Sequence, residues 1–140
     1  MNPEITLLVH NIRSTHNVGA IFRTAEGFSI KKIILSGYTP YPELSLCSKA
    51  PACALIDGEI RSEDPRLPHI REKITSQIHK TALGAESLVP FEFYEDINDW
   101  IKENQRTENL PIIALEQSKD SVMLPEFQPP EKFALLLGEE

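Results

Sequence analysis

Several features that mark secreted, membrane-spanning and metal-binding proteins are scarce or missing from this sequence. Its two cysteines, Cys47 and Cys53, are too few for a disulfide framework and lack the spaced partners of a zinc site. No stretch approaches the roughly 18 apolar residues that a membrane helix needs, and the amino terminus lacks the pattern of a secretory signal. No P-loop, dinucleotide-binding glycine signature or metal-ligand cluster is present. These absences predict a soluble, cytoplasmic chain with free thiols, without a metal and without a membrane segment.

The chain has 140 residues, of which 41% are hydrophobic, and this suits a single domain that covers residues 1–140. Its net charge of −7 argues against nucleic acid as a partner. The charges are unevenly placed, however. Residues 1–80 hold ten lysines and arginines against eight acidic residues, whereas residues 81–140 hold four against thirteen. We therefore expect any polyanion to meet the amino-terminal half.

Short apolar runs alternate with segments of helical period along the chain. Strands are expected at 5–9, 33–35, 88–94, 112–115 and 133–137, and helices at 18–28, 70–80 and 96–104. In the first helix one buried stripe is predicted, formed by Val18, Ile21, Phe22, Ala25 and Phe28. Residues 40–68 carry five prolines and are expected to be mostly loop. Strands separated by helices of about ten residues predict an α/β fold with a mostly parallel sheet flanked by helices.

The segment from the first strand to the first helix, residues 11–28, is the most informative for function, because α/β sites form at such positions. On a helix, the neighbours of Arg23 three and four residues away are Gly19, Ala20, Glu26 and Gly27. Most of them have little or no side chain, which leaves room beside the guanidinium for a ligand. A glycine inside a helix costs about 1 kcal/mol against alanine, so a pair of them next to one arginine needs a reason.

Ordinary structural roles for these residues stay open at this point. Asn17 stands where a helix N-cap is expected, and such a cap alone explains it as well as a site does. Arg23 could be a surface residue paired with Glu26, as most helix charges are.

The pattern Asn-x-Gly-Ala-Ile-x-Arg-Thr-Ala-x-x-Phe over residues 17–28 resembles the first motif of the SpoU/TrmH-type RNA ribose 2′-O-methyltransferases of the SPOUT superfamily. Residues 80–86 and 89–91 are similar to the middle segment of one subgroup, and residues 114–118 to the strand and loop that face the methyl donor. Residues 134–140 resemble the opening of the second motif, Gly-x-Glu. The resemblance spans nearly the whole chain in the right order.

The resemblance implies an α/β fold with a deep trefoil knot in its carboxyl-terminal part, S-adenosyl-L-methionine bound in that knot, and a homodimer. The implied activity is transfer of a methyl group to a ribose 2′-hydroxyl of tRNA or rRNA. The implied catalytic residues are Asn17, Arg23 and Glu140, and the implied cofactor-binding residues are Leu115, Glu116, Leu137 and Gly138.

The third motif of the family is not found, since Glu140 is the last residue of the sequence. We therefore expect the knot-completing segment to be missing, the donor to bind weakly or not at all, and the homodimer to need that segment. Two other interpretations remain: a non-catalytic RNA-binding remnant that has lost the donor pocket, and a small-molecule enzyme on an ordinary doubly wound sheet. The latter is disfavoured because residues 17–23 lack the glycine spacing that binds dinucleotide phosphates.

Overall fold

The computed structural model describes residues 2–47 and 52–139. Helices and strands alternate along most of the chain, with two single 3₁₀ turns at Ala85–Ser87 and Leu124–Glu126. The strands and helices, in chain order, are β1 Glu4–His10, α1 Thr15–Gly27, β2 Lys32–Ser36, β3 Ala54–Ile56, β4 Glu59–Arg61, α2 Pro68–Ala82, β5 Phe91–Tyr94, α3 Ile97–Arg106, β6 Ile112–Ala114 and β7 Lys132–Gly138.

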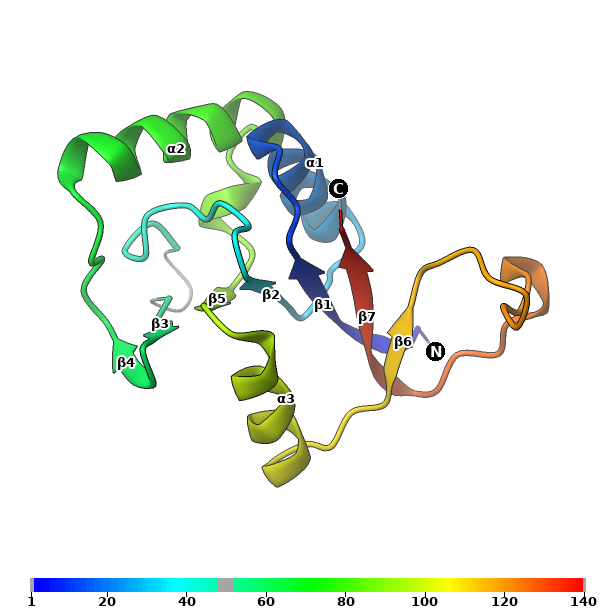
Figure 1. The fold of residues 1–140 in the computed structure, drawn as a ribbon. Coiled ribbons are helices and arrows are strands. Elements are labelled where there is room, and N and C mark those ends of the chain that lie inside the picture. Colours follow the sequence, from blue (N-terminus) through cyan, green and yellow to red (C-terminus); the bar gives the residue numbers. More distant parts are fainter. Residues whose placement is uncertain (1, 48–51, 140) are drawn as a thin grey trace.

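The strands form one sheet of seven in the order β4-β3-β5-β2-β1-β7-β6. All pairs are parallel except β3 with β4. Helices α1 and α2 cover one face of the sheet and α3 lies against the other (Figure 1). The expected α/β fold, a mostly parallel sheet flanked by helices, is confirmed.

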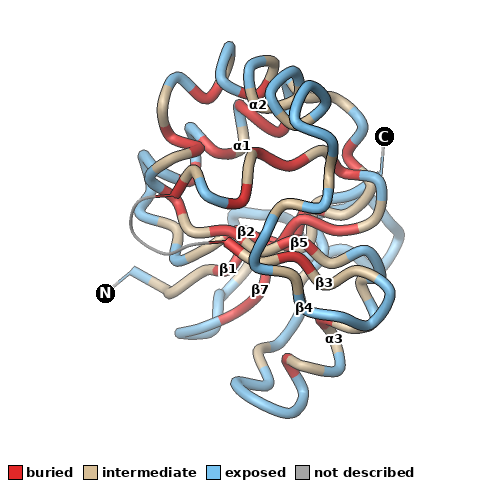
Figure 2. The backbone as a smooth tube through the Cα atoms, turned by 90° about the vertical axis from the view of Figure 1, so that its left-hand side faces the viewer, coloured by how far each residue is buried: buried red, intermediate tan, exposed pale blue. Residues whose placement is uncertain are grey.

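The core has two layers because successive residues of a strand point to opposite faces. On the α1 side the larger cluster includes the edge-to-face pair of Phe22 on α1 and Phe91 on β5, whose ring centroids lie 5.7 Å apart. On the α3 side Trp100 packs against Leu8 of β1 and Ile34 of β2. Buried residues accordingly concentrate in the central strands and on the inner side of α1 (Figure 2). Within the described residues, no helix combines the length and apolar character needed to cross a bilayer.

The stretch 40–68 is mostly loop in its described part, as expected, but it also contains a hairpin that was not predicted. Its strands β3 and β4 are joined by Asp57-Gly58, which has positive φ at both residues, 52° and 74°. Aspartate followed by glycine is a common hairpin turn, and the nearby prolines obscured this signal. The strand expected at 88–94 is confirmed over Phe91–Tyr94. It begins later than expected because the backbone N–H groups of Leu88 and Val89 donate to the carbonyl of Ala85, in the 3₁₀ turn before the strand.

Arg66 connects separate parts of the long segment between β2 and α2 by hydrogen bonds. Its guanidinium donates hydrogen bonds to the carbonyls of Tyr41 (2.7 Å) and Pro42 (3.0 Å), and to both carboxylate oxygens of Asp64 (2.9 and 2.7 Å). It also lies over the Tyr41 ring, 3.7 Å from the centroid. Burial alone would raise the pKa of Asp64, but these hydrogen bonds outweigh it and hold the pKa below its ordinary value.

The end of α1 also differs from the expected pattern. Val18, Phe22 and Ala25 are buried and Ile21 is partly so, as predicted. Phe28 is 78% exposed, so its predicted place in the buried stripe is wrong. The helix ends at Gly27, and the residue after it no longer follows the helical period.

Candidate active site

The carboxyl ends of three neighbouring strands stop at the same level. His10, the last residue of β1, pairs in register with Ser36, the last residue of β2, and with Gly138, the last residue of β7. In open parallel sheets, ligands bind beyond such ends. The amino terminus of α1 follows β1 after four residues, so the first turn of this helix stands at the same edge. This edge is therefore the candidate site.

Asn11 joins the three strand ends. It follows β1 directly and adopts a left-handed conformation, with φ of 54°. Its amide nitrogen donates to Oε1 of Glu139, just after β7 (3.0 Å), and its Oδ1 accepts from the backbone N–H of Tyr38, just after β2 (3.2 Å). One side chain thus sets the relative position of the segments that leave all three strands.

Two glycines make this arrangement possible. Gly37 has φ of 69°, and a Cβ there would lie 1.8 Å from Oδ1 of Asn11, so any side chain would displace the amide that joins the strands. A Cβ on Gly138 would lie 2.8 Å from the carbonyl oxygen of His10. Gly138 therefore has a packing role at the end of β7, whatever it also contributes to a ligand.

The predicted donor-binding residues lie together at one end of this edge. Ala114 of β6 pairs in register with Leu136 of β7, and the backbone N–H of Leu115 donates to the carbonyl of Leu136 (3.0 Å). Leu115 therefore lies beside the end of β7, and the pairing of the two strands stops there. The carbonyl of Glu116 accepts a hydrogen bond from the Ser121 hydroxyl (3.1 Å), which closes the turn after β6.

Asn17 stands in the first turn of α1 and is exposed. It is not the N-cap: Ser14 holds that position, and its hydroxyl accepts from the backbone N–H of Asn17 (3.2 Å). The cap interpretation of Asn17 is therefore wrong.

Arg23 is exposed, and no ion pair joins it to Glu26. Arg23 is six positions after Asn17 on the helix. Their backbone positions are therefore about 9 Å apart along the helix axis and about 120° apart around it. The two side chains thus leave the helix in different directions. The third predicted catalytic residue, Glu140, lies outside the described residues.

The absence of a side chain at position 19 is explained by helix packing and does not require a ligand. A Cβ at Gly19 would lie 2.0 Å from Oγ1 of Thr81 and 2.3 Å from the carbonyl oxygen of Ile78, both on α2. The Thr81 hydroxyl donates across this crossing to the carbonyl of His16 (2.7 Å). Gly19 therefore allows close contact between two helices, whereas Gly27 has open space around it.

Sequence reasoning gave no role to Asn11, Tyr38 or Glu139, which the structure brings to the same edge. The sequence contained one feature that could have identified them, because each stands one or two residues after a strand of the parallel sheet. Their contact could not be foreseen, because residue 11 meets a residue 128 positions away.

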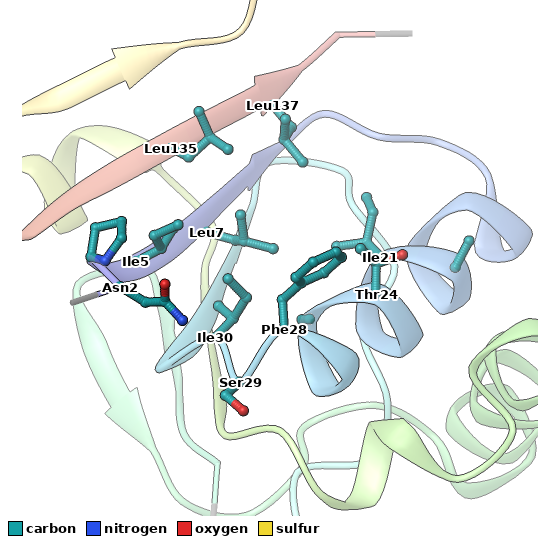
Figure 3. A pocket seen from close by; sticks show the side chains of 13 residues that line it. Asn2, Ile5, Leu7, Ile21, Thr24, Phe28, Ser29, Ile30, Leu135 and Leu137 are labelled. Carbon is teal, nitrogen blue, oxygen red and sulfur yellow. The ribbon is translucent and has the colours of Figure 1, made fainter. Parts of the chain in front are cut away.

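A large cavity next to α1 is apolar and distinct from this polar edge. It has a volume of about 670 Å³ and lies between α1 and the strands β1 and β7 (Figure 3). Ile5, Leu7 and Leu135 line it from the strands, and Phe28 from the end of α1. Among the predicted site residues that the structure describes, Leu137 alone takes part in its lining. Over residues 2–47 and 52–139, no three histidine, cysteine or acidic side chains are grouped so that they could hold a metal ion.

No family model matches the sequence, and no curated protein matches it. The solved structures that are similar include two crystal structures of rRNA methyltransferase from Sinorhizobium meliloti, one of them described as AdoMet bound. Their TM-scores are 0.63 for the AdoMet-bound structure and 0.61 for the other, each at 18% identity. The matches cover 99% and 96% of this chain and 41% and 39% of theirs, so this chain spans about two fifths of the length of the solved chains. At this identity the similarity establishes a shared fold.

Proposed function

We propose that this chain belongs to an S-adenosylmethionine-dependent methyltransferase of the SpoU/TrmH type that acts on a ribose 2′-hydroxyl of RNA. The observation that carries the proposal is the alignment of the strand ends. Asn11, which follows β1, is hydrogen-bonded to Glu139, which follows β7, and β7 pairs in register with β6. A donor and an acceptor would thus meet at one edge. The shared fold with an rRNA methyltransferase supports this proposal. The proposal also includes a trefoil knot and a homodimer for the protein.

The residues at the β6–β7 end fit an adenosyl group. Leu115 is 62% exposed and offers an apolar surface at the end of the edge strand. Gly138 brings bare backbone to the end of the neighbouring strand β7, and Glu116 and Leu137 would complete the donor site. When bound, S-adenosylmethionine supplies a methyl group on a positively charged sulfur. These four residues would bind it and orient it toward β1.

The acceptor side would be formed by Asn17 and Arg23. A ribose hydroxyl is a poor nucleophile, so its positioning and the local charge must supply most of the acceleration. A guanidinium remains protonated at all ordinary pH values, and Arg23 would therefore bind a phosphate and stabilise negative charge on the ribose oxygen. Asn17 would orient the ribose, and Glu140 would complete the catalytic set.

The test is to map ribose methylation in total RNA from cells that lack the gene. The proposal expects 2′-O-methylation to disappear at discrete positions and to return when the wild-type gene is restored. A gene that encodes Arg23→Ala should not restore it. The matched control is Arg106→Ala on α3, which removes an arginine that is paired with Glu103 on the other face of the sheet and should restore methylation fully.

Other outcomes would lead to different conclusions. Loss of a base methylation with all ribose methylation intact would contradict the 2′-O assignment. An unchanged methylation map, together with RNA binding by the purified chain, would favour the alternative of a non-catalytic RNA-binding module. An unchanged map without RNA binding would contradict both.

A further inference from the structure

Tyr38 presents a half-exposed aromatic ring at the candidate site. It stands two residues after the end of β2 and is 51% exposed. Its backbone N–H is held by Asn11, the residue that joins the three strand ends. A large aromatic side chain that is open to solvent beside a polar site calls for an explanation, because its burial would otherwise stabilise the fold.

The turn that carries Tyr38 is held in place by hydrogen bonds of the buried Thr39 side chain. Thr39 is 2% exposed, and its Oγ1 lies 2.7 Å from the carbonyl of Ser36 and 3.2 Å from that of Val9. The same oxygen accepts the backbone N–H of Ile12 (3.1 Å). The backbone under Tyr38 is therefore tied to both β1 and β2. The ring is displayed on a rigid support.

A cation lies against the ring. The guanidinium carbon of Arg13 is 5.5 Å from the ring centroid, within the range of a cation–π contact. An exposed tyrosine beside an arginine, on a rigid support, has the properties of the platforms on which proteins stack unpaired nucleobases. The arginine adds positive charge where the sugar–phosphate backbone would pass.

The order of the strands in the sheet indicates whether Tyr38 is closer to the adenine of the donor or to a base of the RNA substrate. The site residues follow strands in the order β2-β1-β7-β6, with neighbours about 4.8 Å apart. Tyr38 follows β2, whereas Leu115 follows β6 three strands away, about 14 Å by that spacing. The adenine of a donor held at Leu115 would lie at the far end of the edge. The end of β1 is one strand from Tyr38, so a substrate nucleotide with its ribose there would have its own base or a neighbouring base within reach of the ring.

We propose that Tyr38 stacks on an unpaired base of the RNA substrate, at or next to the methylated nucleotide. This inference rests on the proposed function. It adds that the substrate presents the target in a single-stranded loop or bulge, because a ring at this position can stack only on a base that has left its helix.

The experiment measures binding of the full chain to a fluorescein-labelled single-stranded RNA, to a duplex of the same sequence, and to S-adenosylmethionine alone. Tyr38→Leu keeps apolar bulk but removes the aromatic face, and Tyr38→Phe keeps the face. Phe28→Ala is the matched control, since it removes another exposed aromatic ring, at the opposite end of α1. Circular dichroism checks that every variant is folded.

Tyr38→Leu should weaken binding of single-stranded RNA about tenfold. Tyr38→Phe and Phe28→Ala should stay within about twofold of wild type, and duplex binding should not respond to Tyr38. If wild type binds single-stranded RNA and Tyr38→Leu binds it equally well, the stacking role is wrong while the proposed function stands. If Tyr38→Leu instead weakens binding of S-adenosylmethionine, the ring serves the donor and the inference is overturned. A wild-type chain that binds no RNA would contradict the proposed function itself.

Discussion

Substitution of Gly19 by alanine tests how closely α1 and α2 are packed. The added Cβ would stand 2.3 Å from the carbonyl oxygen of Ile78 and 2.0 Å from the Thr81 hydroxyl oxygen, so α2 must move away. Overpacking of this kind costs about 1–3 kcal/mol, and loss of the hydrogen bond from Thr81 to His16 costs about 1 kcal/mol more. Better helix propensity returns about 1 kcal/mol. We expect Gly19→Ala to lower the free energy of unfolding by about 1–3 kcal/mol.

Gly27→Ala is the matched control in the same helix. A Cβ there meets nothing within 4 Å, so only the propensity gain remains, and the variant should be as stable as wild type or up to about 1 kcal/mol more stable. Urea unfolding followed by circular dichroism measures both variants. The double variant Gly19→Ala/Thr81→Ala should recover stability only in part, because the clash with the Ile78 carbonyl remains. A Gly19→Ala chain as stable as Gly27→Ala would refute the packing explanation. If that variant then bound RNA poorly, the glycine would serve the ligand after all.

Three further predictions concern stability. Arg66 lowers the pKa of Asp64 in the folded state, so the ionised Asp64 stabilises the fold at pH values above the unfolded-state pKa. This stabilisation is lost as the pH falls below about 4. Asp64→Asn should flatten the pH dependence of the urea midpoint in that range. Gly138→Ala should push the end of β7 away from the carbonyl of His10 and cost about 1–3 kcal/mol in thermal unfolding, and an unchanged melting temperature would contradict the close contact. Trp100→Ala should cost about 3–5 kcal/mol in urea unfolding, because this residue fills the layer under α3; a loss below about 1 kcal/mol would mean that α3 is not packed as described.

Periodicity predicted most of the elements because each reflects a local rule. The apolar run 5–9 lies inside β1, and the run 133–137 lies inside β7 beside it. The helical stripe from Val18 to Ala25 faces the sheet, as the spacing requires. Phe28 continues this period in the sequence but follows the end of the helix, so the pattern predicted burial where the backbone has already turned.

The candidate site was predictable only in part, because its connections are not local. The resemblance singled out Leu115 and Gly138, and the structure has Leu115 directly after β6 and Gly138 at the end of the neighbouring strand β7. Nothing in the sequence indicated that Asn11 connects residues 38 and 139, because this contact depends on strands from both ends of the chain pairing with β1. The sequence also suggested a ligand as the reason for Gly19, whereas the reason is a helix that begins about 50 residues later.

The positions of Asn17 and Arg23 on α1 limit how they can share the work. About 9 Å along the helix and about 120° around it separate their backbone positions, so the two side chains approach a substrate from different directions. Asn17, in the first turn, is the nearer of the two to the strand ends. Arg23 is further along the helix and exposed, a position suited to a phosphate of the same strand of RNA. In the proposed mechanism the guanidinium therefore binds a phosphate and from there stabilises negative charge on the ribose oxygen, while Asn17 orients the ribose.

This division of roles predicts different results for two substitutions of Arg23. Arg23→Gln removes one charge, so the slope of the logarithm of RNA affinity against the logarithm of salt concentration should fall by about one. Arg23→Lys keeps the charge and this slope, but loses the paired hydrogen bonds of the guanidinium and should bind RNA more weakly at every salt concentration. Fluorescence anisotropy over a salt series measures both. A lysine variant with wild-type affinity would contradict a two-pronged contact with phosphate. A glutamine variant with an unchanged slope would contradict any phosphate contact by Arg23.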